Sequence, residues 1–275
     1  MVAAIDQIER DIAALAAATA TIAEEIQSIY SSYLSALSQA VRQQLVVASY
    51  HLCTQTYPEA FLRLGFSQQQ QLQQALQQLG QQAEPQLYNC LQLLVVSENA
   101  GSSVEQLTEA RANLEQAITE ALRQLSCQAN QLLQRYGVLP PIPIEVTLEA
   151  AGKAEDSARS ITGAPNLLSA LVEIEAEESE PSAQPTHQRE TAFKEPRSGD
   201  AVLAGVATGI LITTIYLRLG EIEFADPTVT GWRSQIRKLC ARLASLEQDV
   251  AKKQRERIIA QAEAAWRASW SNPES

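Results

Sequence analysis

The stretch that decides the fold is residues 5–40, IDQIERDIAALAAATATIAEEIQSIYSSYLSALSQA. Apolar or small residues recur along it in alternating steps of three and four, at Ile5, Ile8, Ile12, Leu15, Thr19, Ile22, Ile26, Ile29, Tyr33, Ala36 and Ala40. This is the heptad spacing of a helix that packs lengthwise against another helix. The stretch therefore predicts a long N-terminal helix with a coiled-coil-like seam.

The seam changes register after Tyr33. The apolar stripe shifts there to Leu37, Val41, Leu45, Ala48 and Leu52. A slip of this kind indicates either a stutter in a coiled coil or a change from a two-helix contact to a wider bundle core. Tyr57 and Pro58 should end the helix, because the residue before a proline disfavours helical backbone.

Three further helices are predicted in the first part of the chain. A glutamine-rich helix starts near Ser67, which a capping box with Gln70 favours, and ends at Gly80. Pro85 should open the next helix, and a fourth should run from Ser102 to about residue 136. Residues 1–136 are therefore predicted to form a helical bundle whose first helix is coiled-coil-like.

The middle of the chain, residues 137–200, differs in composition. It is rich in Pro, Glu and Ser, and we expect a partly disordered linker with short helices. Residues 165–175, PNLLSALVEIE, are predicted to be one of these helices, either packed on the bundle or serving as a short interaction motif. Residues 176–200 hold few large apolar side chains, so burial cannot offset the entropy of ordering them.

An apolar segment begins the third part, residues 201–275. Residues 201–217, AVLAGVATGILITTIYL, carry no charge. A buried helix, a pair of β-strands and a membrane span all fit this composition, although a span usually needs about 20 apolar residues. We favour the first two alternatives, because the run is at the short limit and acidic residues follow it directly.

A long C-terminal helix should follow. Asp226 and Pro227 are a typical N-cap and first helical residue. A second heptad seam then runs through Trp232, Ile236, Leu239, Leu243, Leu246 and Val250. We expect the seam to fail at Lys253 and to give way to an apolar edge that ends in Trp266 and Trp270. The predicted fold class is thus all-α, a helical bundle with a long N-terminal heptad helix and a long C-terminal helix, separated by a partly disordered linker.

Charge is unevenly distributed along the chain. The net charge is −11, but residues 232–275 hold nine Lys or Arg and five Asp or Glu, a balance of +4 that leaves −15 for the rest. An acidic protein of this kind repels nucleic acid, and only the basic C-terminal helix could approach an anionic membrane surface. We therefore expect protein partners or self-association, with an anionic membrane surface as the alternative.

The cysteines and the N-terminus bear on localisation. The four cysteines lie at least 37 residues apart without a CxxC motif, which is typical of thiols in a reducing compartment. The first residues show no basic segment followed by an apolar one, so no signal peptide is predicted. A cytoplasmic location is expected, with a membrane-peripheral one as the alternative.

We find no arrangement of residues typical of catalysis. The GxSxG, HExxH, GxGxxG and GxxxxGK[ST] motifs are absent, and the two histidines are His51 and His187. His51 lies near the end of the first helix, where a structural histidine is the simpler interpretation. We expect no enzyme activity, no catalytic or metal-binding residues and no cofactor.

Two sets of residues are candidates for partner binding. The first is the N-terminal seam of Ile5, Ile8, Ile12, Leu15, Ile22, Ile26 and Ile29. It needs a covering helix, supplied either by another chain or by the seam of residues 232–250. The second set is on the C-terminal helix and comprises Lys252, Lys253, Arg255, Arg257, Trp266 and Trp270. These residues suit an anionic lipid or an acidic surface, although they also suit an ordinary solvated helix face.

Two long strings resemble a known family. Residues 221–270, EIEFADPTVTGWRSQIRKLCARLASLEQDVAKKQRERIIAQAEAAWRASW, and residues 31–64, SSYLSALSQAVRQQLVVASYHLCTQTYPEAFLRL, are similar to a family of uncharacterised cyanobacterial helical proteins. They cover about a third of the chain. The resemblance implies a bacterial cytoplasmic setting, near the thylakoid, and carries no activity, ligand or site residue with it.

Together these observations predict a non-enzymatic helical scaffold or adaptor that acts through helix–helix protein interactions. The alternative is a peripheral or single-span membrane protein, anchored by residues 201–217 or by the basic, Trp-tipped C-terminal helix.

Overall fold

The structure is a computed structural model that describes residues 2–95, 104–141, 164–173 and 209–270. Its helices and strands are, in chain order, α1 (Val2–His51), the π-helix η1 (Leu52–Thr56), α2 (Pro58–Leu62), α3 (Phe66–Cys90), α4 (Gln92–Val95), α5 (Val104–Arg135), β1 (Leu167–Glu173), β2 (Gly209–Ile215), α7 (Leu219–Ala225) and α8 (Pro227–Trp270). The predicted helical bundle with long N- and C-terminal helices is confirmed.

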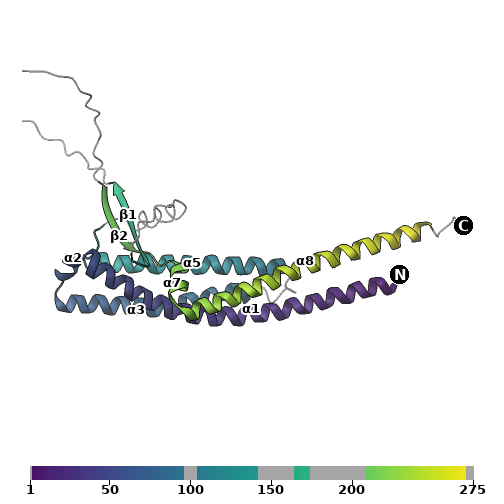
Figure 1. Cartoon of the computed structure of the whole chain (residues 1–275), viewed down its shortest axis with the longest axis horizontal. Coiled ribbons are helices and arrows are strands. Elements are labelled where there is room, and N and C mark those ends of the chain that lie inside the picture. The colour runs from purple at the N-terminus through teal and green to yellow at the C-terminus, as the bar shows by residue number, and fades with distance from the viewer. Residues whose placement is uncertain (1, 96–103, 142–163, 174–208, 271–275) are drawn as a thin grey trace, which may run out of the picture.

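The described residues form an elongated molecule with two regions (Figure 1). In the first, which we call the body, the second half of α1 packs with α3 and α5, and α7, the start of α8 and the base of a β-hairpin complete the core. In the second, which we call the arm, the first 22 residues of α1 run alongside α8 from Leu243 onward. Both termini of the described chain lie at the arm's end.

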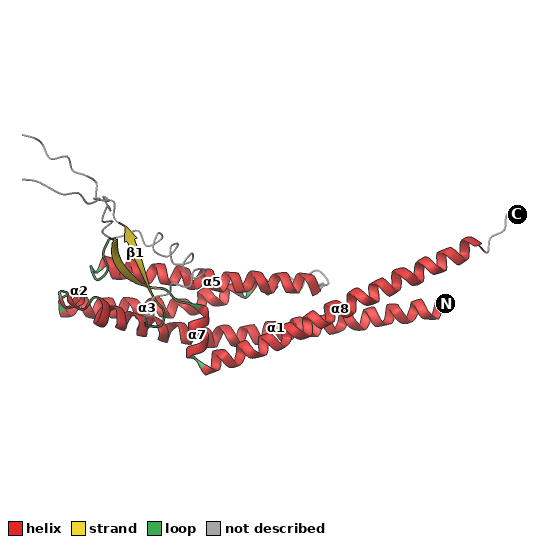
Figure 2. Ribbon diagram, turned by 45° about the horizontal axis from the view of Figure 1, so that its top comes forward, coloured by secondary structure: helices red, strands yellow, loops and turns green. Residues whose placement is uncertain are grey.

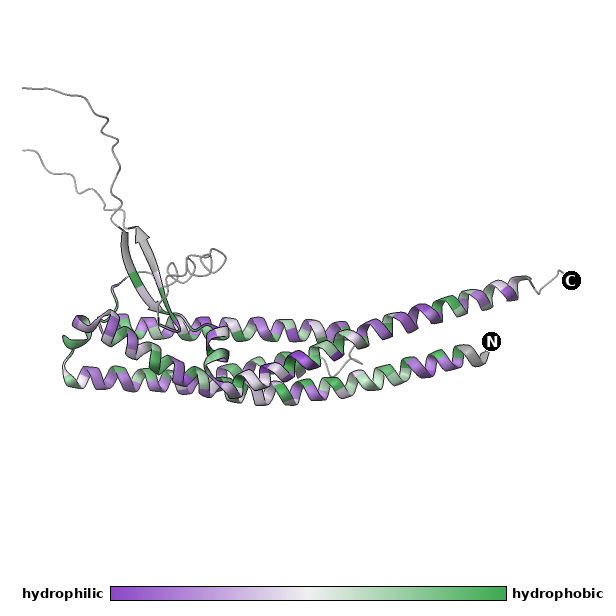
Figure 3. Cartoon of the chain, in the orientation of Figure 1, coloured by the Kyte–Doolittle hydropathy of each residue, from purple (hydrophilic) through white to green (hydrophobic). Residues whose placement is uncertain are grey.

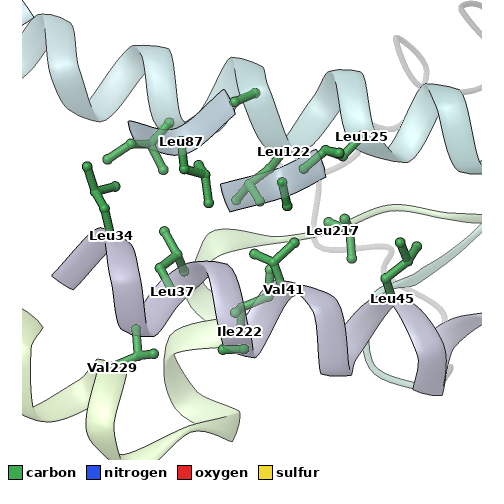
Figure 4. Packing of buried hydrophobic residues seen from close by; sticks show 14 of the residues in the cluster. Leu34, Leu37, Val41, Leu45, Leu87, Leu122, Leu125, Leu217, Ile222 and Val229 are labelled. Atoms are coloured by element: carbon green, nitrogen blue, oxygen red, sulfur yellow. The ribbon is translucent and has the colours of Figure 1, made fainter. Parts of the chain in front are cut away.

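The change of register in α1 marks the start of the body. Tyr33 and Leu34 are adjacent in sequence and both fully buried, as are Leu37, Val41 and Leu45 further along. Adjacent helix positions can both be buried only where neighbours cover more than one side of the helix. In Figure 4, Leu34, Leu37, Val41 and Leu45 of α1 lie opposite Leu87 of α3 and Leu122 and Leu125 of α5. Ile222 of α7 and Val229 of α8 lie on the other side of α1, which identifies the slip as a change to a wider core.

The end of α1 agrees with the sequence in part. The helix continues as the π-helix η1, and Tyr57 then leaves the helical region before Pro58 opens α2, as the Tyr-Pro pair predicts. The backbone N–H of Tyr57 donates to the Leu52 carbonyl at 2.8 Å and closes the wide π turn.

Helix α3 corrects three expectations. Its N-cap is Gly65 rather than Ser67, and the Gln68 side chain accepts a hydrogen bond from the Gly65 N–H at 3.1 Å. The helix does not end at Gly80, where an added Cβ would lie 3.0 Å from Cγ of Arg42 on α1. That glycine permits close helix packing instead of a helix end. Pro85 lies inside α3 and does not start a new helix.

The predicted helix at residues 165–175 is wrong, because Leu167–Glu173 is strand β1. It pairs antiparallel with β2, with Leu167 opposite Ile215 and Glu173 opposite Gly209 (Figure 2). Residues 209–215 are therefore one strand of a hairpin, so a membrane-spanning helix over residues 201–217 does not form here. Of the alternatives for residues 201–217, the structure has a single strand at residues 209–215, and its partner is β1 rather than a second strand of the same run. Residues 201–208 and most of the predicted disordered linker, 142–163 and 174–208, lie outside the described residues.

Helix α8 starts as predicted. Oδ1 of Asp226 accepts hydrogen bonds from the backbone N–H of Thr228 at 2.7 Å and of Val229 at 3.3 Å. These bonds satisfy two of the amides that a helix N-terminus leaves open. The helix then continues to Trp270, which makes it the partner of α1 over most of the molecule's length.

Candidate interaction surface

The two heptad seams pair with each other inside one chain. Helices α1 and α8 run antiparallel, and two ion pairs fix their register: Glu25 with Arg242 at 2.7 Å, and Asp11 with Lys253 at 3.1 Å. The guanidinium of Arg233 lies 5.3 Å from the Tyr33 ring centroid at the inner end of the same interface. Of the two alternatives for covering the N-terminal seam, the structure contains the intramolecular one.

Burial of the N-terminal seam decreases toward the end of the arm. Ile22 and Ile26 are 4% and 2% exposed, and Thr19, the seam residue before Ile22, is also buried. The remaining predicted seam residues, Ile5, Ile8, Ile12, Leu15 and Ile29, are half-buried. A single partner helix covers only one side of α1, so the seam residues far from the body keep part of their surface in water.

The seam of α8 does not fail at Lys253 as expected. Its three-and-four spacing continues through Lys253, Arg257, Ala260 and Ala264, all of which are half-buried. The Lys253 ammonium bonds Glu256 at 2.9 Å and also reaches Asp11 across the interface. These hydrogen bonds raise the pKa of Lys253, and the bond from Lys253 lowers the pKa of Asp11. A charged pair within an apolar seam favours one register over others.

The basic, Trp-tipped end of α8 divides between two faces. Lys253 and Arg257 lie in the seam, whereas Lys252 and Arg255 are exposed. Trp266 is 65% exposed, and Ile258 and Ile259 are exposed on the same helix. The Trp270 backbone is helical, but its side chain lies outside the described residues. The six residues predicted as one binding set are therefore not brought together.

Between Ile12 and Thr21, the exposed residues of α1 are alanines apart from Thr21. No charged residue occurs between Asp11 and Glu24, and Figure 3 shows this stretch as a green band. Its solvent-facing positions include five exposed alanines, Ala13, Ala14, Ala16, Ala17 and Ala20. Alanine keeps a helix formed without a partner, and its short side chain lets another helix approach closely. We call these five residues the alanine face.

A half-buried polar cluster lies at the inner end of the α1–α8 interface, within the body. Arg233 of α8 forms a two-pronged ion pair with Glu115 of α5, in which Nη2 lies 2.8 Å from Oε2, and its Nε lies 2.7 Å from Oε1 of Glu223. The hydroxyls of Tyr30 and Tyr33 on α1 donate to Glu115 and Glu223, both at 2.6 Å. One guanidinium therefore ties together α1, α5, α7 and α8.

The ionisation of this cluster follows from burial and hydrogen bonding. Burial raises the pKa of both tyrosines, and their bonds to carboxylates raise it further, so they remain protonated donors. Burial opposes ionisation of Glu115, but the hydrogen bonds from Arg233 and Tyr30 outweigh it and lower the pKa of Glu115. Burial alone would lower the pKa of Arg233, but its bond to Glu115 and its electrostatic interactions with Tyr33, Glu115 and Glu223 together outweigh burial and raise it. The cluster is thus a satisfied ionic network.

The described residues offer little that suits catalysis. The best-formed pocket, about 370 Å³ beside η1, is lined mainly by apolar residues and glutamines and does not include His51. No group of three or more His, Cys, Asp or Glu in the described ranges has an arrangement that could hold a metal ion. All four cysteines are free, and burial raises the pKa of Cys53 to about 11. A thiol of this kind is a poor nucleophile.

One helical stretch in the described part of the chain, Ile5–Thr56, is long and apolar enough to cross a membrane by length and composition. Only 17% of its most apolar 18-residue window is buried in the fold. The second half of the same stretch supplies the body's core, and core helices of soluble bundles can be equally long and apolar. The stretch is therefore notable for the apolar surface that it leaves exposed in the arm.

Reasoning from sequence missed Arg233, Glu115 and Glu223 as a connected set. Glu115 is 118 residues from Arg233, and isolated charges on amphipathic helices usually indicate solvated faces. The sequence holds one indication that Arg233 lies at a helix contact, namely that it directly follows the seam residue Trp232.

Comparison of the chain with known proteins found no matching family model, no similar curated protein and no similar solved structure.

Proposed function

We propose that the protein is a non-enzymatic helical scaffold or adaptor that binds a helical partner along the alanine face of its arm. The observation that supports this proposal most directly is a long helix that is uncharged for twelve residues, from Ile12 to Ala23, and paired on one side only. Because the arm extends beyond the body, a partner helix can align with it without meeting α3 or α5 (Figure 1).

The charge pattern gives this surface defined ends. Asp11 closes the uncharged stretch on one side, and Glu24 and Glu25 close it on the other. Asp11 and Glu25 are already paired with Lys253 and Arg242 of α8, so a partner helix with small or apolar residues along its contact face would match this surface. Such an interaction buries modest area, so we expect micromolar rather than nanomolar affinity.

The test is a single charge on the alanine face. Ala17→Glu places a carboxylate at an exposed position while keeping a good helix-forming residue, so the arm should fold normally. The matched control is Gln74→Glu at an exposed position of α3 in the body. Partners captured from native cells by the wild-type protein are identified and purified, and their affinities for the three proteins are measured by isothermal titration calorimetry.

The proposal predicts at least a tenfold loss of affinity for Ala17→Glu and less than a twofold change for Gln74→Glu. Self-association through the arm would give the same pattern in sedimentation equilibrium, and would also support the proposal. A partner that binds both variants equally well would overturn it, because the contact would then lie elsewhere on the molecule. Absence of both a partner and self-association would overturn it as well.

A second candidate is peripheral association with an anionic membrane through the end of α8. The exposed Trp266, Ile258 and Ile259 share the end of α8 with the exposed Lys252 and Arg255, and basic and large apolar residues on one helix are typical of interfacial helices. This candidate predicts sedimentation with phosphatidylserine vesicles at low salt, lost in the Lys252→Gln/Arg255→Gln variant and in Trp266→Ala. The exposed Gln254→Ala is the control that should retain binding. No binding by the wild-type protein would exclude the candidate.

A further inference from the structure

Side chains of the body close the outer edge of strand β2. The Asn130 side-chain amide of α5 accepts from the Ile215 N–H at 2.9 Å and donates to the Ile215 carbonyl at 2.8 Å. The Tyr57 hydroxyl accepts from the Thr213 N–H at 3.0 Å and donates to the carbonyl of the same residue at 3.3 Å. The two side chains thus replace the missing neighbouring strand at alternate residues of β2.

The corresponding edge of β1 is open. The Tyr216 N–H donates to the Asn166 carbonyl, so the pairs 166–216, 168–214 and 170–212 exchange hydrogen bonds within the hairpin. The backbone groups of Ser169 and Leu171 therefore point away from β2. Among the described residues they have no hydrogen-bond partner, whereas the Leu167 N–H is bonded to the Ala164 carbonyl.

The sequence of β1 does nothing to protect this edge. LLSALVE contains no proline and no lysine, and its single charge is at the last residue, Glu173. Natural edge strands that remain uncovered usually carry such residues, because exposed strand edges pair with other chains. A sheet of two strands is also only marginally stable in water, and three or more strands are needed for independent stability.

We propose that the open edge of β1 pairs with β1 of a second copy of this chain, antiparallel and about a twofold axis. The resulting sheet has the order β2-β1-β1-β2. Both of its outer edges are then β2 strands, whose outward backbone groups at Ile215 and Thr213 are already bonded by Asn130 and Tyr57. A foreign strand would instead leave its own outer edge unpaired, which is why the second copy is the better occupant.

Charge is compatible with this arrangement. An antiparallel pairing centred on Ala170 puts each Glu173 opposite Leu167 of the other copy. The two carboxylates are then six residues apart along the strands, about 20 Å at the rise of a β-strand, and repel each other little. The hairpin stands out from the side of the body formed by the described helices (Figures 1 and 2).

The test removes one outward amide. Ser169→Pro deletes an N–H at the open edge and leaves the hydrogen bonds to β2 in place, since proline is tolerated on an edge strand. The Ser169 hydroxyl is 2.7 Å from the Thr213 hydroxyl, so Ser169→Ala serves as the matched control that loses this bond and keeps the amide. Sedimentation equilibrium of the full chain should show a dimer whose dissociation constant rises at least tenfold in Ser169→Pro and less than twofold in Ser169→Ala.

Hydrogen exchange of the wild-type protein provides a second measurement that needs no variant. Dilution from the dimer to the monomer should speed exchange of the Ser169 amide and leave the Ile215 amide, which Asn130 holds, unchanged. A chain that stays monomeric at all concentrations would overturn the proposal, as would a dimer equally tight in a folded Ser169→Pro variant. A dimer that is lost in Ala17→Glu but kept in Ser169→Pro would place the contact on the arm, so this inference would fail while the proposed function stood.

Discussion

The two halves of α1 have similar apolar spacing but differ greatly in burial. From Tyr33 to Ala48 its core positions are fully buried beneath α3, α5, α7 and α8, whereas Ile5, Ile8 and Ile12 are half-buried against α8 alone. The difference shows that the heptad pattern specifies which side of a helix is covered, while the number of neighbours determines how completely. The body therefore contributes most of the buried apolar surface, and the arm retains exposed apolar surface against which another helix can pack.

Removing the guanidinium of the polar cluster in the body should have the largest effect. Arg233→Ala leaves the half-buried Glu115 and Glu223 carboxylates without their cation, which should cost about 3 kcal/mol of unfolding free energy, the lower end of the range for a buried pair. The measurement is urea denaturation followed by circular dichroism. The control is the exposed Arg237→Ala on the same helix, which should change the unfolding free energy by about 0.5 kcal/mol or less. Equal losses in the two variants would show that the cluster contributes no more to stability than an exposed arginine.

Matched leucine truncations compare the regions directly. Leu37→Ala in the body creates a cavity in a fully buried site and should cost about 3 kcal/mol. Leu15→Ala in the arm removes a half-buried side chain, whose surroundings can relax into water, and should cost about 1 kcal/mol. Thermal or urea unfolding measures both values. A loss at Leu15 as large as that at Leu37 would contradict the two-helix arm, because it would require further cover there.

The pH dependence of stability should report on the polar cluster around Arg233. The pKa of Glu115 is lowered from 4.5 in the folded state, because hydrogen bonds from Arg233 and Tyr30 outweigh burial. A lowered carboxyl pKa means that the unfolded chain binds the proton more readily. The stabilisation is therefore fully present above pH 4.5 and is lost as the pH falls through the lower folded value. Glu115→Gln should flatten the wild-type stability profile below pH 4.5, and an unchanged slope would exclude this role.

Replacing the charged residue of the arm's seam should have the smallest effect on overall stability. Lys253→Leu extends the apolar seam of α8 and removes the ion pair with Asp11. We expect slower hydrogen exchange in residues 5–15, since the seam gains apolar contact, together with increased self-association, since the register constraint is lost. Lys252→Leu, on the exposed side, is the control. Faster exchange in Lys253→Leu would show that the ion pair, rather than apolar contact, holds the arm together.

The sequence predicts the helices well where periodicity is long. The seam of α1, its slip after Tyr33 and the start of α8 at Asp226 and Pro227 all agree with the structure, because each depends on local spacing or capping. Short segments are less certain, since LLSALVE fits a helix or a strand by composition. Its identity is decided by β2, which lies more than thirty residues further along the chain.

The candidate surface could be predicted only in part. The isoleucine seam was identified from its spacing, but its cover by α8 depends on the direction in which two distant helices run. The sequence predicts that the second seam ends at Lys253, because charged residues usually lie in water. In the structure, the long side chains of Lys253 and Arg257 let both residues occupy seam positions. The alanine face follows from the same pairing, because only the position of α8 determines which side of α1 stays uncovered.

The central claim is that α1 and α8 pair antiparallel within one chain. It is tested most directly by electron–electron double resonance between spin labels at the exposed positions Ala17 and Gln248, with the four cysteines replaced by alanine. Since packed helix axes lie about 10 Å apart, the labels should give a narrow distance distribution below about 30 Å. That distribution should be unchanged when a tenfold excess of unlabelled protein is added. A broad distribution beyond this range, or a short distance that disappears on dilution, would contradict the account.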